Sequence, residues 1–575
     1  MAETTKVNSR PTAAALVAAL GSVVGTSHVR SKDRHTRYYR SGFRSGSGVA
    51  HAVVFPGTLL EQWRCLQVCV DAGAAIVMQA AKTGLTEGST PSGDEYGRPV
   101  VIINVTRLKG ITLLDGGRQA LVKAGATLRE LEHELATVDR APHSVIGSSG
   151  IGATVVGGIA NNSGGALCKR GAAYTELSLY ARVNDEGELE LVDDLGIDGL
   201  GDTPEEILTR LEHGDFSTDG VNGLDIAASD RTYATRVRHL DAPVPSRYNA
   251  DPLRLHGVSG SAGKVAAFAV RVDTFAVPKQ TRAFLLGTDD PEALAALRRS
   301  ILSSFAHLPE MAEYLDRSTF ECAERYGKDV FLAVKHLGTR RLPKAYAFKA
   351  RAEHALNRIP FLPDYLPDRV LYWLSRLLPK HLPERMRRFG IDHEHLLILV
   401  VADDAIEETT GYLDDVWRRT PGCDVLECDD REHEAVLLHR FAAAGAALRY
   451  QTIRHRRTEE VLALDVALLG RDTDWVGKPT GDTAEGLDRM LSYGHFLCHV
   501  FHRDYIYVRG TDLNSRKAAL LERLTDDGAK YPAEHNVGHL YEADDSLRTF
   551  YTELDPTNTF NPGIGKTHKS RRPCC

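Results

Sequence analysis

Two glycine-rich segments are the parts of the sequence best suited to hold a phosphate-bearing ligand. The first, QAAKTGLTEGSTP (79–91), follows an apolar run and carries two glycines and four hydroxyl side chains. Glycines let backbone N–H groups approach a pyrophosphate closely, and hydroxyls add hydrogen-bond donors. The segment matches neither GxGxxG nor GxxxxGK[ST], so it indicates neither a Rossmann site nor a P-loop. Taken alone, it could also be an ordinary surface turn.

The second segment, HSVIGSSGIGATVVGGIANNSGGALCKRG (143–171), contains eight glycines among small and apolar residues. So much glycine would cost a regular helix or strand about 0.5–1 kcal/mol per residue. The glycines are therefore expected to serve turns with positive φ or a close backbone approach to a flat ligand. A purely structural glycine-rich turn is the alternative.

The elements around these segments indicate an α+β domain between about 51 and 275. Short apolar runs alternate there with glycine-rich turns. Strands are expected at 52–57, 75–79, 100–105 and 120–125, with helices at 59–73 and 127–135. The apolar run at 12–25 precedes these elements and could be read as part of a signal peptide, but Glu3 and the missing A-x-A cleavage site argue against that. We therefore expect an N-terminal helix, capped near Ser9 and with Pro11 in its first turn. No uncharged apolar run reaches the ~18 residues that a membrane span needs.

A strongly basic stretch lies at 335–388. It holds 13 Lys and Arg against four acids, a net charge of +9, whereas the whole chain carries −7, so the remainder carries −16. Val370, Trp373, Leu374, Leu377 and Leu378 fall on one helical face within it. Basic residues that flank an apolar stripe suit an interfacial helix on anionic lipid. Packing against the acidic remainder, a dimer contact and a nucleic-acid patch are the alternatives, the last without any accompanying motif.

Several long strings resemble one known family. PHSVIGSSGIGATVVGGIANNSGG, QAAKTGLTEGSTP, FAVRVDTF (268–275), PAEHNVGHLY and DPTNTFNPGIGKT look like the quinone-dependent D-lactate dehydrogenases, peripheral membrane flavoproteins of the vanillyl-alcohol-oxidase type. The likeness runs over nearly the whole chain. It implies an α+β fold in which a two-subdomain FAD-binding domain carries an α+β cap and a basic membrane-binding insertion.

The resemblance also implies which residues hold FAD. Gly147, Thr154 and Gly164 would line the flavin, and Val270 would meet the adenine part by its backbone. Covalent relatives commonly place a histidine just after the glycines of the first loop, but Leu85 stands there, so noncovalent FAD is expected. The pyrophosphate would be held by Ala80, Ala81, Lys82, Thr83, Gly84, Gly88 and Ser89.

A 2-hydroxy acid needs its carboxylate clamped, its hydroxyl proton removed and its Cα hydrogen aimed at flavin N5. His535 is the expected general base, because an imidazole near its free pKa accepts a proton at neutral pH. The guanidinium of Arg440 can donate two parallel hydrogen bonds to the substrate carboxylate. A structural histidine and a helix-surface arginine are the alternatives for these two. Lys566 is placed near the flavin, where a cation would stabilise its reduced anion.

His495 and His502 have the spacing of metal-binding histidines in related D-2-hydroxy-acid dehydrogenases, where the motif is GHxGDGNxH. The third ligand there is the glutamate of an EHG motif, which corresponds to Glu534. This chain reads GHFLCHVFH and lacks GDGN, so the imidazoles could instead hydrogen-bond lactate directly. His499 and His539 fit a structural role better.

These observations predict a respiratory enzyme that oxidises D-lactate to pyruvate by hydride transfer to FAD and passes the electrons to a membrane quinone. It would sit on the cytoplasmic face of the inner membrane through 335–388, bind no nucleic acid, and have no signal peptide or transmembrane helix. Alternatives are a soluble FAD dehydrogenase of D-2-hydroxyglutarate or glycolate with another acceptor, and a noncatalytic lipid-binding or flavin-sensing protein. The expected parts are an FAD domain (1–278), cap (279–334), membrane segment (335–390), cap with the substrate site (391–525) and C-terminal return (526–575).

Overall fold

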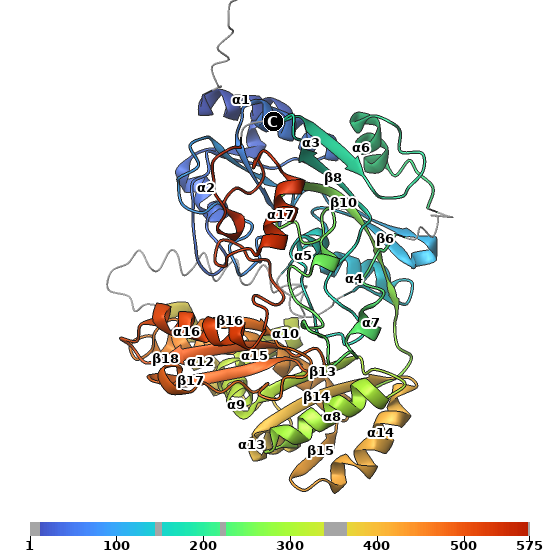
Figure 1. The fold of residues 1–575 in the computed structure, drawn as a ribbon, viewed down its shortest axis with the longest axis vertical. Coiled ribbons are helices and arrows are strands. Elements are labelled where there is room, and N and C mark those ends of the chain that lie inside the picture. Colours follow the sequence, from blue (N-terminus) through green and yellow to red (C-terminus); the bar gives the residue numbers. More distant parts are fainter. Residues whose placement is uncertain (1–11, 144–151, 219–225, 338–364, 573–575) are drawn as a thin grey trace, which may run out of the picture.

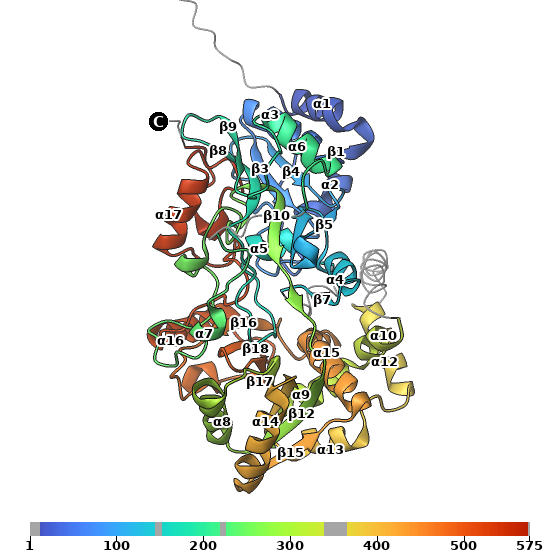
Figure 2. The same cartoon turned by 90° about the vertical axis from the view of Figure 1, so that its right-hand side faces the viewer.

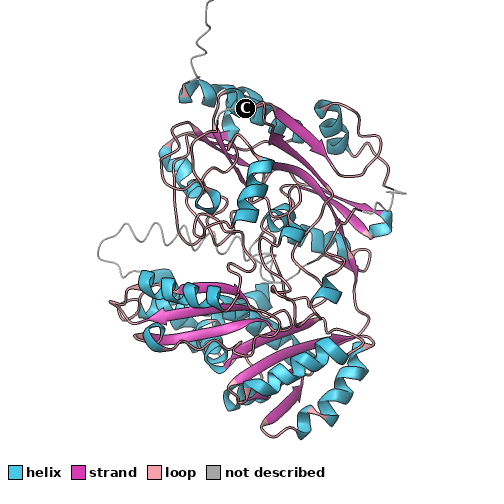
Figure 3. Cartoon of the chain, in the orientation of Figure 1, coloured by secondary structure: helices cyan, strands magenta, loops and turns pink. Residues whose placement is uncertain are grey.

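The structure is a computed structural model that describes residues 12–143, 152–218, 226–337 and 365–572. Figure 1 shows two regions stacked along the long axis. One region holds the strands of the N-terminal half together with the red C-terminal segment, and the other is built around one large sheet. Figure 3 shows helices and strands mixed in both regions, as an α+β fold requires.

The first small sheet has the strand order β1-β2-β4-β3. Its three longer strands run parallel, and all of β2 and β4 is buried. The helix that follows β2 is capped by Thr58, whose hydroxyl accepts from the Glu61 N–H at 3.1 Å. The strands are β1 (Val29–Arg30), β2 (Ala52–Val54), β3 (Ala75–Gln79) and β4 (Val100–Asn104), and the helices are α1 (Ala13–Val24), α2 (Asp33–Arg40) and α3 (Leu59–Asp71).

The second sheet is antiparallel, with the order β5-β6-β10-β8-β9. β10 is its central strand and is buried over nearly its whole length. A minor pair, β11 with β7, extends toward the cap. The strands are β5 (Ile111–Leu114), β6 (Gln119–Lys123), β7 (Arg140–Ala141), β8 (Ser178–Val183), β9 (Leu189–Asp193), β10 (Ala266–Asp273) and β11 (Phe275–Ala276), and the helices are α4 (Leu128–Ala136), α5 (Val155–Ala160), α6 (Pro204–His213) and α7 (Tyr233–Arg236).

The cap is a seven-stranded antiparallel sheet with the order β15-β12-β14-β13-β17-β18-β16. Helices cover both faces, and the interior strand β14 is buried throughout. The strands are β12 (Thr281–Thr288), β13 (Met311–Asp316), β14 (His395–Ala402), β15 (Cys423–Glu427), β16 (Leu462–Ala467), β17 (Leu487–His495) and β18 (Val500–Tyr507). The helices are α8 (Pro291–Ser304), α9 (Arg317–Tyr326), α10 (Lys328–Leu337), α12 (Leu366–Leu377), α13 (Glu384–Asp392), α14 (Ala405–Asp415), α15 (Asp430–Arg454) and α16 (Leu513–Asp526). The last helix, α17 (Asp545–Leu554), lies in the other region with the C-terminal segment (Figure 1).

The end of the chain returns to the first small sheet. Phe560 forms a bridge beside Ile76 of β3, whose N–H donates to the Thr559 carbonyl at 2.9 Å and whose carbonyl accepts from the Asn561 N–H at 2.7 Å. The C-terminal segment therefore pairs with the free edge of a sheet whose other strands lie almost 500 residues earlier.

The expected elements of the N-terminal half are all present, with boundaries that differ by a few residues. Only the cap of the first helix was misplaced. The α1 helix begins at Ala13 and its N-cap is Thr12, whose hydroxyl accepts from the Ala15 N–H at 3.3 Å. The predicted cap, Ser9, and Pro11 lie outside the described residues.

Candidate functional site

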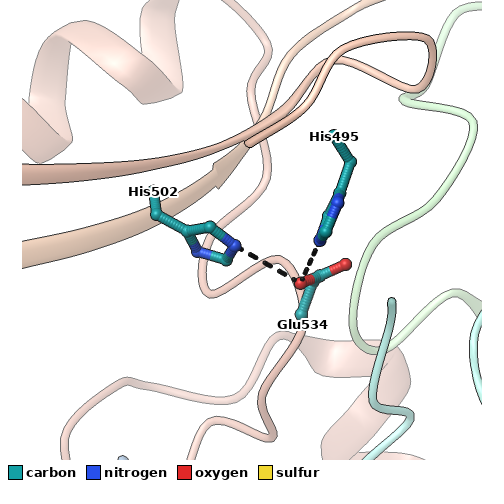
Figure 4. A group of neighbouring side chains, drawn as sticks. All are labelled: His495, His502 and Glu534. Atoms are coloured by element: carbon teal, nitrogen blue, oxygen red, sulfur yellow. Dashed lines mark hydrogen bonds and ion pairs between the residues drawn. The ribbon is translucent and has the colours of Figure 1, made fainter. Parts of the chain in front are cut away.

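Three predicted side chains meet at one end of the large sheet (Figure 4). His495 ends β17 and His502 lies on β18, and these strands form a hairpin, so residues seven apart in sequence become neighbours. Their ring centroids lie 5.6 Å apart. Glu534 arrives from the segment after α16, and its Oε2 lies 3.1 Å from His495 Nε2 and 3.6 Å from His502 Nε2.

Each histidine has a carboxylate directly opposite it on the neighbouring strand. Glu313 of β13 pairs in register with His495, and its Oε1 lies 2.6 Å from His495 Nδ1. Asp465 of β16 pairs in register with His502, and its Oδ1 lies 3.1 Å from His502 Nδ1. Sequence reasoning missed both acids. The available signal was an acid between apolar residues in each of the strands MAEYLD and LALDVA.

The charges in this cluster stabilise one another. Burial opposes ionisation, but the carboxylates of Glu313 and Glu534 raise the pKa of His495 to about 10. Burial alone would raise the pKa of Glu534, yet His495 and Arg247 hold it well below its usual range. A neutral imidazole has a single N–H and cannot donate to two carboxylates. His495 therefore needs either a proton on both ring nitrogens or a metal ion in place of one proton.

The donor atoms of this cluster fit a divalent metal ion. One ligand atom from each of His495, His502 and Glu534 can be chosen so that all lie within 4.8 Å of one another. Ligands ~2.0–2.2 Å from an ion, at tetrahedral or octahedral angles, lie roughly 3.0–3.5 Å apart, close to the 3.1 and 3.6 Å observed here. The carboxylates behind both Nδ1 atoms are the usual second partners of metal-binding imidazoles.

The second glycine-rich segment packs directly on this cluster. A Cβ on Gly164 would lie 1.9 Å from Glu534 Oε1, so no larger residue fits beside the carboxylate as it is placed. Arg247 links the glycine-rich segment to Glu534, because Nη1 donates to the Gly165 carbonyl at 2.7 Å and Nη2 contacts Glu534 Oε1. The Asn161 side chain donates to the Glu534 carbonyl at 3.2 Å. The predicted flavin-lining segment and the histidine cluster are thus one site. Gly147, another predicted residue of this segment, lies outside the described residues.

The first glycine-rich segment reaches the same region through Asn536. The Gly88 Cα lies so close to Asn536 that an added Cβ would be 2.5 Å from its Oδ1, whereas a Cβ on Gly84 would meet open space. Lys82 adopts φ 58°, and its ammonium donates to the Ser41 carbonyl at 2.5 Å. The predicted pyrophosphate residues 80–84, 88 and 89 are all half-buried.

Thr154 and Val270 occupy regular elements. Thr154 caps α5, with its hydroxyl accepting from the Gly157 N–H at 3.1 Å. Val270 lies in the middle of β10, fully buried between β6 and β8, which leaves its backbone less open to a ligand than that of the loop residues.

The two predicted catalytic residues lie beside the cluster. Arg440 of α15 donates from Nε to Glu313 Oε2 at 2.7 Å, and its guanidinium lies 4.9 Å from the Tyr493 ring centroid. His535 lies 3.9 Å from Asp465, and its side chain is 27% exposed, the most open of the cluster. Burial lowers the pKa of His535, an effect that Asp465 opposes.

The other predicted residues lie apart from the cluster. The His499 ring bonds the Leu469 carbonyl, and the His539 ring bonds the Gly563 and Thr90 carbonyls. Lys566 lines a basic cavity of about 310 Å³ together with Lys264 and Arg572.

Arg44, which sequence reasoning also missed, faces the cluster from the other region. It lies in a short loop tied to the first glycine-rich segment, where Ser45 donates to Glu87 Oε1 at 2.6 Å. Although burial raises the pKa of Asp504 and Tyr493, the positive charge of Arg44 acts to lower both. Among the residues that the structure describes, no salt bridge involves the exposed Arg44 guanidinium.

The α12 helix presents its apolar side to solvent. Trp373 is 62% exposed and Leu377 67%, whereas Asp368 and Tyr372 are buried. Asp368 pairs with Arg449 of α15 at 2.9 Å, and Tyr372 stacks on Tyr326 of α9 at 5.2 Å. This orientation is the reverse of that in an ordinary surface helix. Within the described parts of the chain, no helix is both long and apolar enough to cross a bilayer.

The fold defines the class of protein. The chain superimposes on 4-ethylphenol oxidase from Gulosibacter chungangensis with a TM-score of 0.57 at 13% identity, covering 96% of this chain and 97% of that one. For p-cresol methylhydroxylase the TM-score is 0.56 at 12% identity, with the same coverage. At such identities the likeness concerns the fold alone, which is that of the vanillyl-alcohol-oxidase-type FAD enzymes. A family model described as "FAD binding domain" matches residues 50–190.

The particular family follows from the sequence relatives. A family model described as "D-lactate dehydrogenase, membrane binding" matches residues 283–572. The quinone-dependent D-lactate dehydrogenase of Escherichia coli is 49% identical over 96% of both chains. The Haemophilus influenzae enzyme is 46% identical over 97% of this chain and 98% of its own, and the Corynebacterium glutamicum enzyme is 40% identical over 95% of each. The chain belongs to the quinone-dependent D-lactate dehydrogenase family.

Proposed function

We propose that this enzyme oxidises D-lactate to pyruvate and passes the electrons to a membrane quinone. FAD, bound noncovalently, would supply the hydride acceptor. The observation that supports this best is the packing of Gly164 against Glu534 within a chain of this family, because it joins the flavin-lining segment to a cluster of candidate catalytic groups.

The residues of the cluster suit a 2-hydroxy acid. Arg440 is oriented by its Nε bond to Glu313, so its terminal nitrogens can receive the substrate carboxylate. His535 is proposed as the base that takes the hydroxyl proton, because it is the most open imidazole of the cluster. Arg440 bonds Glu313, which also bonds His495, and His535 follows Glu534, the residue against which Gly164 packs.

His495, His502 and Glu534 are proposed to hold a divalent ion that would polarise the substrate hydroxyl when bound. The support is the donor spacing and the carboxylate behind each histidine. In the alternative, the two imidazoles hydrogen-bond lactate directly and His495 keeps a proton on each nitrogen.

Membrane association is proposed to run through the α12 helix and its basic neighbours within 335–388. The outward apolar face supports insertion at the acyl boundary, and the cations would be attracted by anionic lipid. We place this contact on the cytoplasmic leaflet, beside the quinone pool.

The substrate is tested by anaerobic flavin bleaching with D-lactate, L-lactate and D-2-hydroxyglutarate in turn. We expect rapid bleaching with D-lactate and a greatly slowed reaction in His535→Ala. Bleaching by L-lactate alone would contradict the proposal. Faster bleaching by D-2-hydroxyglutarate than by D-lactate would favour the alternative function, a dehydrogenase of larger D-2-hydroxy acids with another acceptor.

A further inference from the structure

A second basic and aromatic surface lies far from α12 in sequence. Residues 30–43, here called the α2 surface, contain the α2 helix and carry five Lys and Arg against a single acid, Asp33. These residues lie outside both family-model matches, of which the one described as membrane binding covers 283–572. The cations are Arg30, Lys32, Arg34, Arg37 and Arg40.

Two large aromatic side chains project from this surface. The side chain of Tyr38 is 64% exposed and that of Phe43 is 53% exposed. The exposed fraction of Tyr38 is similar to those of Trp373 and Leu377 of α12, which are among the most exposed large apolar side chains described. Arg34 lies one helical turn before Tyr38, so a cation and an aromatic ring share the outward face. Thr36 is the one residue of α2 that is buried.

The positive charge of the α2 surface is largely uncompensated. Asp33 bonds both Arg37 and Arg40, at 3.1 and 2.5 Å. Lys32 and Arg34 take part in no salt bridge among the residues that the structure describes. The longest segment outside the described residues, 338–364, has six Lys and Arg against two acids, so its charge would repel this surface.

The α2 surface and α12 lie on the same side of the molecule. Figures 1 and 2, which differ by 90°, both place α2 and α12 to one side of the long axis, α2 on the upper region and α12 on the lower. A single flat membrane can therefore contact both. The Lys82 ammonium lies 4.4 Å from the Tyr38 ring centroid, which ties this face to the first glycine-rich segment.

We propose that the α2 surface is a second membrane contact, with Lys32 and Arg34 on anionic phospholipid headgroups and Phe43 at the acyl boundary. Charge complementarity and its position on the same side of the molecule as α12 carry the proposal (Figures 1 and 2). It rests on the proposed membrane association through α12. Both regions of the enzyme, and the flavin site between them, would then be held against the bilayer.

Vesicle sedimentation tests the proposal with the full-length, FAD-loaded enzyme. Vesicles of phosphatidylcholine with about one third phosphatidylglycerol are compared with phosphatidylcholine alone, at low and high salt. Lys32→Gln/Arg34→Gln should weaken binding to the anionic vesicles roughly 10- to 30-fold, at ~1 kcal/mol per cation. Phe43→Ser should weaken it independently of salt.

The matched control is Lys279→Gln/Arg299→Gln, which removes two exposed cations, one of them on α8 at the opposite side of the molecule (Figure 2). It should bind as wild type. Trp373→Ser/Leu377→Ser tests the α12 contact separately. Melting curves and dye-linked D-lactate oxidation confirm that each variant is folded.

The outcomes separate the two ideas. If only the α12 variant loses binding, the α2 proposal is wrong and membrane association through α12 stands. If wild type itself fails to sediment with anionic vesicles, both are wrong. If the Lys32/Arg34 variant loses affinity for DNA but not for vesicles, the surface has a different partner and the proposal is overturned.

Discussion

Replacing Gly164 with alanine isolates the contact between the second glycine-rich segment and Glu534. The new Cβ would lie 1.9 Å from Glu534 Oε1 and 2.6 Å from its Cδ, far inside van der Waals contact. The carboxylate cannot move aside freely, because it is buried and contacts both Arg247 and His495.

The expected magnitude follows from what the displaced carboxylate loses. Overpacking costs ~1–3 kcal/mol, and a hydrogen bond to a charged group is worth ~1.5–3 kcal/mol. We expect Gly164→Ala to destabilise the protein by about 2–4 kcal/mol. If the substrate depends on the same carboxylate, a loss of ~3 kcal/mol in the transition state slows flavin reduction about 100-fold.

Gly158→Ala is the matched control, because it lies in the same segment but a Cβ there would meet nothing within 4 Å. It also lies inside α5, where alanine is the better helix former by ~1 kcal/mol. The assays are urea unfolding and stopped-flow flavin reduction by D-lactate. Equal stability and equal reduction rates for the two variants would refute the close approach of this backbone to Glu534.

Three further predictions concern other groups. Burial lowers the pKa of His439 to about 3, so the folded state excludes a proton that the unfolded chain binds below pH ~6.5, and stability falls as the pH drops. His439→Gln can keep the hydrogen bond to the Phe320 carbonyl. Between pH 7 and 5, the free energy of unfolding of this variant, measured by urea titration, should fall by about 2 kcal/mol less than that of wild type. The same pH dependence of the unfolding free energy in both proteins would contradict this. Because Arg44 faces the cluster from the other region, we expect it to bind the substrate carboxylate together with Arg440. Arg44→Met should then raise KM for D-lactate about 10- to 100-fold with a smaller change in kcat, as for a lost charge-assisted hydrogen bond of ~1.5–3 kcal/mol; an unaltered KM would exclude this role of Arg44. Chelation should remove a stoichiometric divalent ion, measured by mass spectrometry, and His502→Ala should prevent its return; a metal-free enzyme of full activity would favour direct hydrogen bonding of lactate.

The sequence was informative where signals are local. The strand AIVMQ was predicted with its observed bounds. The spacing of His495 and His502 pointed to a shared site through its resemblance to the GHxGDGNxH motif, and the structure brings the two residues together in the β17–β18 hairpin. The apolar face of α12 was likewise visible as a helical repeat, and the structure leaves it exposed.

The partners of these residues could not be predicted, because sheet register sets them. Glu313 lies 182 residues before His495, and only the pairing of β13 with β17 brings them together. Arg440 was recognised as a candidate, but its bond to Glu313 depends on how α15 packs beneath the sheet. Arg44 lies in the N-terminal region, whereas the histidine cluster lies in the cap. No periodicity in the sequence predicts that these two regions face each other at this point.

The return of the chain's end to β3 has a consequence for biosynthesis. Ile76 pairs across to Phe560, Arg98 donates to the Asn558 carbonyl, and Lys264 donates to the Phe560 carbonyl at 2.9 Å. A ribosome has made the N-terminal half and the cap before these partners emerge, although domains usually fold in the order of their synthesis. The edge of the first small sheet therefore stays unpaired in the nascent chain until residues 558–560 have been synthesised.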